Sequence, residues 1–200
     1  VVDLKVAQGN GSLTQDVVID NSAADTAQAL NLDLIQSYGG SQDADGLYLV
    51  SDQNQQLELN GNTWKKFDLG GYQITKNTVL EFDFQSTRIS EISGIGFDND
   101  NTPFNTESTF QLSGIQNFGI KAYKDYSINS GWKSYKINAG DYLSGDFQYL
   151  TFTNDHDAGG DRGNSSYRNI RLYESKRNNV VEAFASLAVD PVNDAPILSG

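Results

Sequence analysis

Hydrophobic and polar residues alternate along most of the chain in short segments, which is the pattern of half-buried β-strands. Leu80, Phe82 and Phe84 share one face of such a segment, and the acidic residues between them share the other. The alternation predicts about ten strands, at residues 45–51, 56–61, 63–69, 78–86, 91–98, 108–114, 118–123, 132–138, 147–153 and 166–174. Residues 21–33 are the one helical candidate. We therefore expect an all-β fold, an antiparallel β-sandwich of the jelly-roll kind.

The composition excludes several classes of function. Cysteine is absent, which rules out disulfides, thiolate metal sites and cysteine nucleophiles. The 26 acidic and 14 basic residues give a formal net charge of −12, which opposes binding to nucleic acids and anionic membranes and attracts cations. No apolar run is long enough to span a bilayer, and no nucleophile elbow, HExxH, phosphate loop or dinucleotide motif occurs. We therefore expect a binding protein rather than an enzyme.

One loop between two expected strands concentrates oxygen-bearing side chains. Residues 154–164 contain three Asp, two Asn and three Gly. Such loops are commonly plain surface turns, but neighbouring carboxylates repel one another unless a cation lies between them. Calcium takes roughly six to eight oxygen ligands, and Gly lets backbone carbonyls turn toward the ion. The clustering favours calcium, with candidate ligands Asp155, Asp157, Asp161, Asn154, Asn164 and a carbonyl of Ala158 or Gly159.

Two further acidic clusters lie in expected loops. One contains Asp98 and Asp100, and the other contains Asp43 and Asp45. Each has the composition of a solvated turn or of a structural calcium site. We take structural calcium as the expectation for both.

The stretch FTND...GGD.....YRNIRLYE, residues 152–174, is similar to the closing strand, loop and strand of calcium-dependent xylan-binding carbohydrate-binding modules. Segments such as LNGNTWKKFDL and IGFDNDN extend the resemblance over residues 35–174 to related modules of marine bacterial surface proteins. Near the end of the chain, DPVNDAPIL resembles the junctions between cadherin-like repeats in very large bacterial adhesins of the RTX type.

The resemblance implies a β-sandwich whose exposed calcium completes its coordination with oxygens of a ligand. In the xylan-binding modules these are vicinal hydroxyls of a sugar, and in similar adhesin domains they are the carboxylate at a peptide's C-terminus. Carried onto this chain, it implies Asp155 and Asp161 as the surest calcium ligands, and Arg162, Asn164 and Ser165 as residues that bind the ligand's edge. The chain departs from the xylan-binding pattern between its Gly pair and Arg168, so the resemblance leaves both kinds of ligand, peptide and sugar, open.

Aromatic side chains and the single histidine complete the candidate chemistry. Tyr126, in a loop, and Tyr167, just beyond the acidic loop, are expected at the rim of the ligand site. Trp64 and Trp132 are expected in the core. His156 has no catalytic partner in the sequence, and we expect it to be exposed.

We expect residues 1–178 to form the sandwich and residues 179–200 a C-terminal strand and a linker into a following cadherin-like repeat. The chain begins without Met, so we expect a piece of a longer protein. The functional hypothesis is a calcium-dependent ligand-binding module of a secreted bacterial surface adhesin. Its expected partners are a peptide or protein C-terminus on a target cell and neighbouring repeats of the same chain, with no nucleic acid and no membrane insertion. The alternatives are a lectin-like module that binds vicinal hydroxyls of a glycan, and a calcium-stiffened spacer without a ligand.

Overall fold

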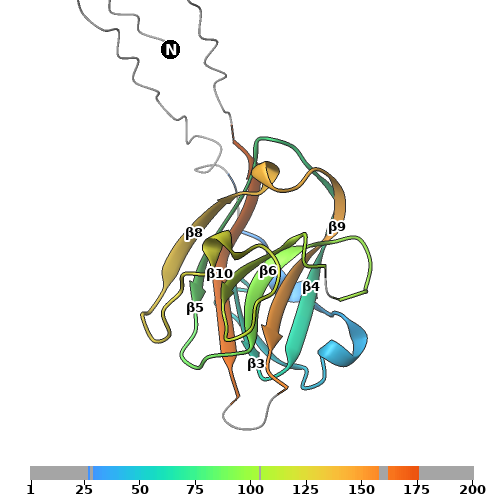
Figure 1. Ribbon diagram of the computed structural model, residues 1–200. Helices are drawn as coiled ribbons and strands as arrows, with labels where there is room; N and C mark the ends of the chain where they lie inside the picture. Colours follow the sequence, from blue (N-terminus) through green and yellow to red (C-terminus); the bar gives the residue numbers. More distant parts are fainter. Residues whose placement is uncertain (1–26, 28, 104, 158–161, 176–200) are drawn as a thin grey trace, which may run out of the picture.

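The computed structural model describes residues 27, 29–103, 105–157 and 162–175, which form two facing antiparallel sheets (Figure 1). The strands are β1 (Gln36–Ser37), β2 (Leu47–Ser51), β3 (Gln56–Asn60), β4 (Thr63–Ile74), β5 (Thr78–Gln85), β6 (Ile92–Asp98), β7 (Thr109–Ser113), β8 (Lys133–Asn138), β9 (Gly145–Asp155) and β10 (Asn164–Glu174). Four short 3-10 helices join them, at η1 (Leu32–Leu34), η2 (Gly40–Gln42), η3 (Lys121–Tyr123) and η4 (Ala139–Asp141). The expected all-β sandwich is confirmed.

The strand pairing has the nested order of a jelly roll. Sheet A runs β1-β4-β9-β6-β7, and sheet B runs β2-β3-β10-β5-β8. From β3 onward the chain behaves as one long hairpin rolled up on itself, because β3 pairs with β10, β4 with β9, β5 with β8 and β6 with β7. This winding brings the start of the hairpin and its end together as the neighbouring strands β3 and β10 of sheet B. Loops that are far apart in the sequence consequently share the same end of the molecule.

The core between the sheets is aromatic. Phe82 and Phe84 of β5 are 1% and 0% exposed, and the intervening acidic residues point outward, as the alternation predicted. The ring of Tyr167 from β10 lies 5.2 Å from that of Phe84 and 5.3 Å from that of Phe152 in the opposite sheet. These contacts tie sheet A to sheet B through large rings rather than through charges.

The outer face of sheet A is also covered, so burial in its strands does not alternate. Every residue of β6 is buried. The ring of Tyr38, from the segment before η2, lies 6.1 Å from that of Trp64, and the ring of Phe118 lies 6.0 Å from Trp64 on β4. Trp64 is 2% exposed, as expected for a core position, although it packs outside the sheet rather than between the sheets.

Residues 118–123 are not the strand that their composition predicted. Ile120 makes a single bridge to Phe110, and the chain then enters η3. Gly119 has φ +68°, and a Cβ on it would lie 2.3 Å from the carbonyl oxygen of Thr109, so the turn requires glycine. The helical candidate at 21–33 contributes only η1, capped by the side chain of Asn31, within the described residues.

The expected domain boundary at 178 and the strand and linker at 179–200 lie outside the described residues. In the part of the chain that the structure describes, no helix is long and apolar enough to cross a membrane.

Candidate functional site

Several loops meet at one end of the sandwich, the lower end in Figure 1. Antiparallel pairing sets the start of β4 opposite Asn154, the start of β6 opposite Asp155, and the end of β3 opposite Asn164. The loops brought together in this way are residues 43–46, 60–62 and 86–91, with both ends of the 154–164 segment. The jelly-roll winding therefore surrounds the predicted calcium loop with three segments that are remote in the sequence.

Asn154 connects these loops. Its Oδ1 accepts hydrogen bonds from the hydroxyls of Ser90 at 2.6 Å and Ser165 at 2.7 Å, and its Nδ2 donates to the carbonyls of Gly61 at 2.5 Å and Gly163 at 3.2 Å. The side chain is fully buried. Because both hydrogens and both lone pairs of the amide are used, Asn154 fixes the loops and has no oxygen left for a metal.

Asn164 and Ser165 are likewise scaffold residues. Asn164 Oδ1 accepts from the backbone nitrogens of Thr87 at 3.0 Å and Arg88 at 2.8 Å, and the residue is 7% exposed. Ser165 is 0% exposed and donates to Asn154. The expectation that these two side chains contact a ligand is wrong for this arrangement, since their polar atoms hold neighbouring loops.

Three carboxyl groups crowd together beside this scaffold. Glu91 accepts from the backbone nitrogen of Asp157 at 2.9 Å and from Gln116 Nε2 at 2.7 Å, and its own backbone nitrogen donates to the carbonyl of Asp155 at 2.8 Å. Trp64 Nε1 donates to Asp155 Oδ1 at 3.4 Å. Asp155 and Glu91 are 8% and 7% exposed, whereas Asp157 is exposed. Two carboxylates of the predicted loop therefore face a third that the sequence analysis missed.

The crowding raises the pKa of two of these acids. Burial raises the pKa of Asp155, opposed in part by the indole hydrogen bond, and the charges of Asp157 and Glu91 raise it further. The hydrogen bond and charge of the nearby Glu91 carboxyl raise the pKa of Asp157. The shift of Asp157 and the smaller part of the shift of Asp155 express like charges held close together, which a cation would relieve.

His156 stands between Asp155 and Asp157 in the sequence, and its surroundings are not those that we expected. It is partly exposed, yet both of its ring nitrogens are inaccessible to solvent and have no hydrogen-bond partner among the described residues. The hydrogen bond from the backbone nitrogen of Asn62 is the largest cause that lowers the pKa of nearby Asp45, with smaller contributions from Arg162 and His156. The expectation of an exposed histidine is therefore wrong.

Asp45 and Arg162 join the second acidic cluster to the predicted loop. Arg162 Nη1 lies 2.7 Å from Asp45 Oδ1, and Asp45 Oδ2 accepts from the backbone nitrogen of Asn62 at 2.8 Å. Gly61, with φ +70°, allows this approach, because a Cβ there would collide with Asp45 and touch Arg162. Half of the Arg162 side chain stays exposed, at 52%. Both predicted residues thus lie at the site, where each is the other's ion partner.

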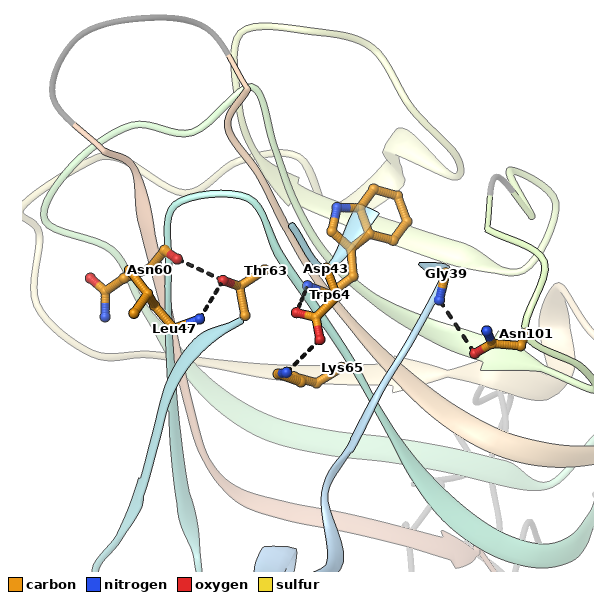
Figure 2. Close-up of polar contacts among 8 residues, drawn as sticks. All are labelled: Gly39, Asp43, Leu47, Asn60, Thr63, Trp64, Lys65 and Asn101. Carbon is orange, nitrogen blue, oxygen red and sulfur yellow. Dashed lines mark hydrogen bonds and ion pairs between the residues drawn. The ribbon is translucent and has the colours of Figure 1, made fainter. Parts of the chain in front are cut away.

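Asp43 forms a buried ion pair instead of a free metal ligand. Its Oδ2 lies 2.5 Å from Lys65 Nζ, and its Oδ1 accepts from the backbone nitrogen of Trp64 at 3.2 Å. Figure 2 shows the carboxylate between these two groups, with the neighbouring loop held by the bond from Gly39 to Asn101. The two charged side chains are only 4% and 5% exposed. The ammonium of Lys65 therefore supplies the positive charge that was expected from calcium.

Asp98 and Asp100 lie at the opposite end of β6, on the order of 20 Å from the start of that strand. Asp98 is 4% exposed and accepts from the hydroxyl of Tyr38 at 2.6 Å and from the backbone nitrogen of Asn99 at 2.7 Å. Asp100 is exposed and accepts from the backbone nitrogen of Thr102 at 2.6 Å, which makes an Asx turn. The structure does not bring this cluster to the other acids.

The two tyrosines expected at a ligand rim are core residues. Tyr167 is 0% exposed, and its hydroxyl donates to the carbonyl of Gly94 at 2.7 Å. Tyr126 is 8% exposed, and its hydroxyl donates to the carbonyl of Gly131 at 2.8 Å. The rim assignment is wrong for both, because each ring packs in the interior and each hydroxyl bonds to backbone. Trp132 is partly exposed rather than buried.

Asp161 and Gly159, also predicted as calcium ligands, lie outside the described residues. Among the residues that are described, no group of three or more histidine, cysteine or acidic side chains is arranged so that it could hold a metal ion. The donor chemistry of Glu91, Asp155 and Asp157 nevertheless suits a hard cation, because all three offer carboxylate oxygens. Glu91 could have been found from the sequence only by pairing residues 91–98 with residues 147–153, since that register sets it beside Asp155.

The fold places the chain in the class of two-sheet jelly-roll β-sandwiches with an acidic loop cluster at one end. The chain matches no protein-family model, and comparisons of the chain with curated proteins and with solved structures found no significant match.

Proposed function

We propose that this domain is a calcium-dependent ligand-binding module of a bacterial surface adhesin. The observation that carries the proposal is the crowding of Glu91, Asp155 and Asp157 at the loop end of the sandwich, with the pKa values of both aspartates raised. Like charges held so close favour a divalent cation, and carboxylate oxygens favour calcium or magnesium over softer metals.

Glu91, Asp155 and Asp157 are the described residues that would hold the ion. Asp155 is oriented by the Trp64 indole and Glu91 by Gln116, so two of the three carboxylates are fixed before an ion arrives. The sequence prediction adds Asp161 and the carbonyl of Gly159 to this set. The exposure of Asp157 leaves one side of the group open to solvent, where oxygens of a ligand have access.

The proposed ligand is a carboxylate, favoured as the C-terminus of a peptide or protein. The support is Arg162, whose guanidinium pairs with Asp45 in a neighbouring loop of the same end of the sandwich and keeps 52% of its side chain exposed. Arginine pairs with carboxylates through two parallel hydrogen bonds. A peptide C-terminus would thus bridge the ion and the arginine, and adhesion of cells that display such termini is the biological role proposed for the module.

The first experiment measures thermal unfolding with calcium, with magnesium and with EDTA. Calcium at a hundredfold its Kd adds about 2.7 kcal/mol of stability by linkage alone, which corresponds to roughly 5–11 °C for a domain of this size. The variant Asp157→Asn should lose this calcium-dependent rise. The matched control is Asp52→Asn, which changes an exposed aspartate in the turn between β2 and β3. This control should keep the calcium-dependent rise in Tm. An equal rise in both variants would place the ion elsewhere.

The second experiment compares peptides with a free and an amidated C-terminus, together with sugars bearing vicinal hydroxyls, in calcium and in EDTA. Calcium-dependent binding of the free acid alone supports the proposal. Calcium-dependent binding of the sugars alone supports the lectin-like alternative. A folded, calcium-stabilised protein that binds neither is a spacer, and that result refutes the adhesive function.

A further inference from the structure

A polar depression lies on the outer face of sheet B, away from the acidic loop. The cavity measures about 360 Å³. Its floor is the outward face of β5, β8 and β10, which lie side by side in Figure 1, and residues before η1 form one wall. The residues that line it are Ala27, Ala29, Glu81, Phe82, Asp83, Ser134, Asn169 and Arg171.

The polar groups of this cavity are joined in one network centred on Asp83. Its Oδ1 accepts from the hydroxyl of Ser134 at 2.6 Å, and its Oδ2 accepts from Asn169 Nδ2 at 2.9 Å and Arg168 Nε at 3.1 Å. Burial alone would raise the pKa of Asp83, but these three hydrogen bonds outweigh it and hold the pKa below its usual value. The carboxylate is therefore ionised and fixed in orientation.

A second ion pair, between Arg171 and Glu81, also lines the cavity. Arg171 Nη2 donates to Glu81 Oε1 at 2.6 Å, and the hydroxyl of Tyr173 donates to Glu81 Oε2 at 2.8 Å. Arg168, which lies outside the lining, pairs with Asp83 in the same way, so each of the two lining carboxylates has a guanidinium partner. A ligand for this cavity gains nothing from a net charge of its own.

A break in the regular sheet creates the network. The pairing of β10 with β5 shifts between Arg168 and Arg171, and Asn169 has φ +53°, a left-handed conformation uncommon outside glycine. This bulge turns the Asn169 amide onto Asp83, whereas a regular strand would place successive side chains on opposite faces. Bulges of this kind commonly re-aim side chains at binding sites.

An aromatic ring stands next to the cavity. Trp132 directly precedes β8 and lies two residues before Ser134, the spacing that puts both side chains on one face of a strand. The guanidinium of Arg168 lies 4.2 Å from the centre of its ring, so Arg168 connects the ring to Asp83. The ring is partly exposed.

From these observations we infer that the cavity is a calcium-independent binding site for a neutral, hydroxyl-rich ring, a monosaccharide unit. Its volume falls in the range of small-ligand sites. Its lining offers hydroxyl, amide, carboxylate and guanidinium groups, and sugar hydroxyls both donate to such acceptors and accept from such donors. Both lining carboxylates are already paired with guanidinium groups, which favours a neutral ligand, and the partly exposed Trp132 indole beside Arg168 offers a flat apolar surface for a sugar face.

The test is an NMR titration of the isotopically labelled domain with xylose, glucose, galactose and mannose, each in EDTA so that no calcium site contributes. We expect at least one sugar to cause saturable shifts at the amides of Ser134 and Asn169. Ser134→Tyr fills the cavity from an exposed position and should weaken binding by about tenfold or more. The matched control Ser127→Tyr, on an exposed loop outside the cavity, should leave affinity within about twofold.

A second variant guards against a folding defect in the first. Asn169→Gly keeps the left-handed conformation and removes only the amide, so the domain should stay folded and bind severalfold more weakly. No saturable shift with any of the four sugars would overturn the inference, as would shifts that survive Ser134→Tyr unchanged. Neither result bears on the calcium site, because calcium is absent throughout.

Discussion

The buried ion pair between Lys65 and Asp43 allows the sharpest test of the structure. The two charged atoms lie 2.5 Å apart, and the side chains are only 5% and 4% exposed. The variant Lys65→Met keeps most of the side-chain volume but removes the ammonium. Asp43 would then hold an uncompensated charge in a buried place, and the backbone nitrogen of Trp64 is the remaining donor that the described residues give it.

Removing one partner of a buried pair costs about 3–5 kcal/mol of unfolding free energy. For a domain of this size each kcal/mol lowers Tm by roughly 2–4 °C, so we expect a loss of roughly 6–20 °C. The double variant Lys65→Met/Asp43→Asn leaves no buried charge, and it should recover at least about 2 kcal/mol of that loss. The control Lys76→Met, at an exposed turn, should stay within about 0.5 kcal/mol of the wild type.

The assay is urea unfolding followed by tryptophan fluorescence, with calorimetry for Tm, both in EDTA and in calcium. A loss below about 1 kcal/mol for Lys65→Met would refute the reasoning, because that is the magnitude of a solvated surface pair. Restoration of the variant to wild-type stability by calcium would also refute it. In that case Asp43 would be a metal ligand, as the sequence first suggested, and Lys65 only its substitute.

Two further predictions concern the core and the acidic group. Tyr167→Phe removes a fully buried hydroxyl that donates a hydrogen bond to the carbonyl of Gly94. We expect the free energy of unfolding, measured by urea titration, to fall by about 1–2 kcal/mol. A fall below about 0.3 kcal/mol would mean that this hydrogen bond contributes nothing to stability. Asp155 has a raised pKa in the folded state, so its contribution to stability is fully present below its unfolded pKa and is lost as pH rises through the folded value. In EDTA, the Tm of the wild type should therefore rise relative to that of Asp155→Asn as the pH is lowered from neutral to about 4. A difference in Tm between the two proteins that does not vary with pH would contradict the raised pKa of Asp155.

Much of the fold could be read from the chain because strand alternation is local. Leu80, Phe82 and Phe84 were assigned to the core from their spacing alone, and all three are buried. The alternation failed in sheet A, where β6 is buried on both faces by loops that pack outside the sheet. It also failed at Gly119, whose turn is decided by a contact with Thr109 in another segment.

The candidate site was predicted less completely than the fold. Residue type alone does not separate side-chain oxygens that hold the loops by hydrogen bonds from those that are available to a metal or a ligand. Asn154 and Ser165 look like ligands in a polar loop, yet they bond to each other in the interior. Glu91 attracted no attention in the sequence, since its neighbours Asp155, at the end of β9, and Asp157, just after that strand, are distant along the chain.

The sequence by itself determined most of the strands, the two-sheet class, the absence of cysteine chemistry and the acidic character that favours cations, because periodicity and composition are properties of the chain. The tertiary structure decided the partner of each charge. The rolled hairpin gave Asp43 a lysine, Asp45 an arginine and Asp155 two further carboxyls, so three aspartates of similar local sequence have different chemistry. The physical reason is that the energy of a carboxylate depends on its burial and on the charges beside it, and in a jelly roll those neighbours come from strands that are far apart in the sequence.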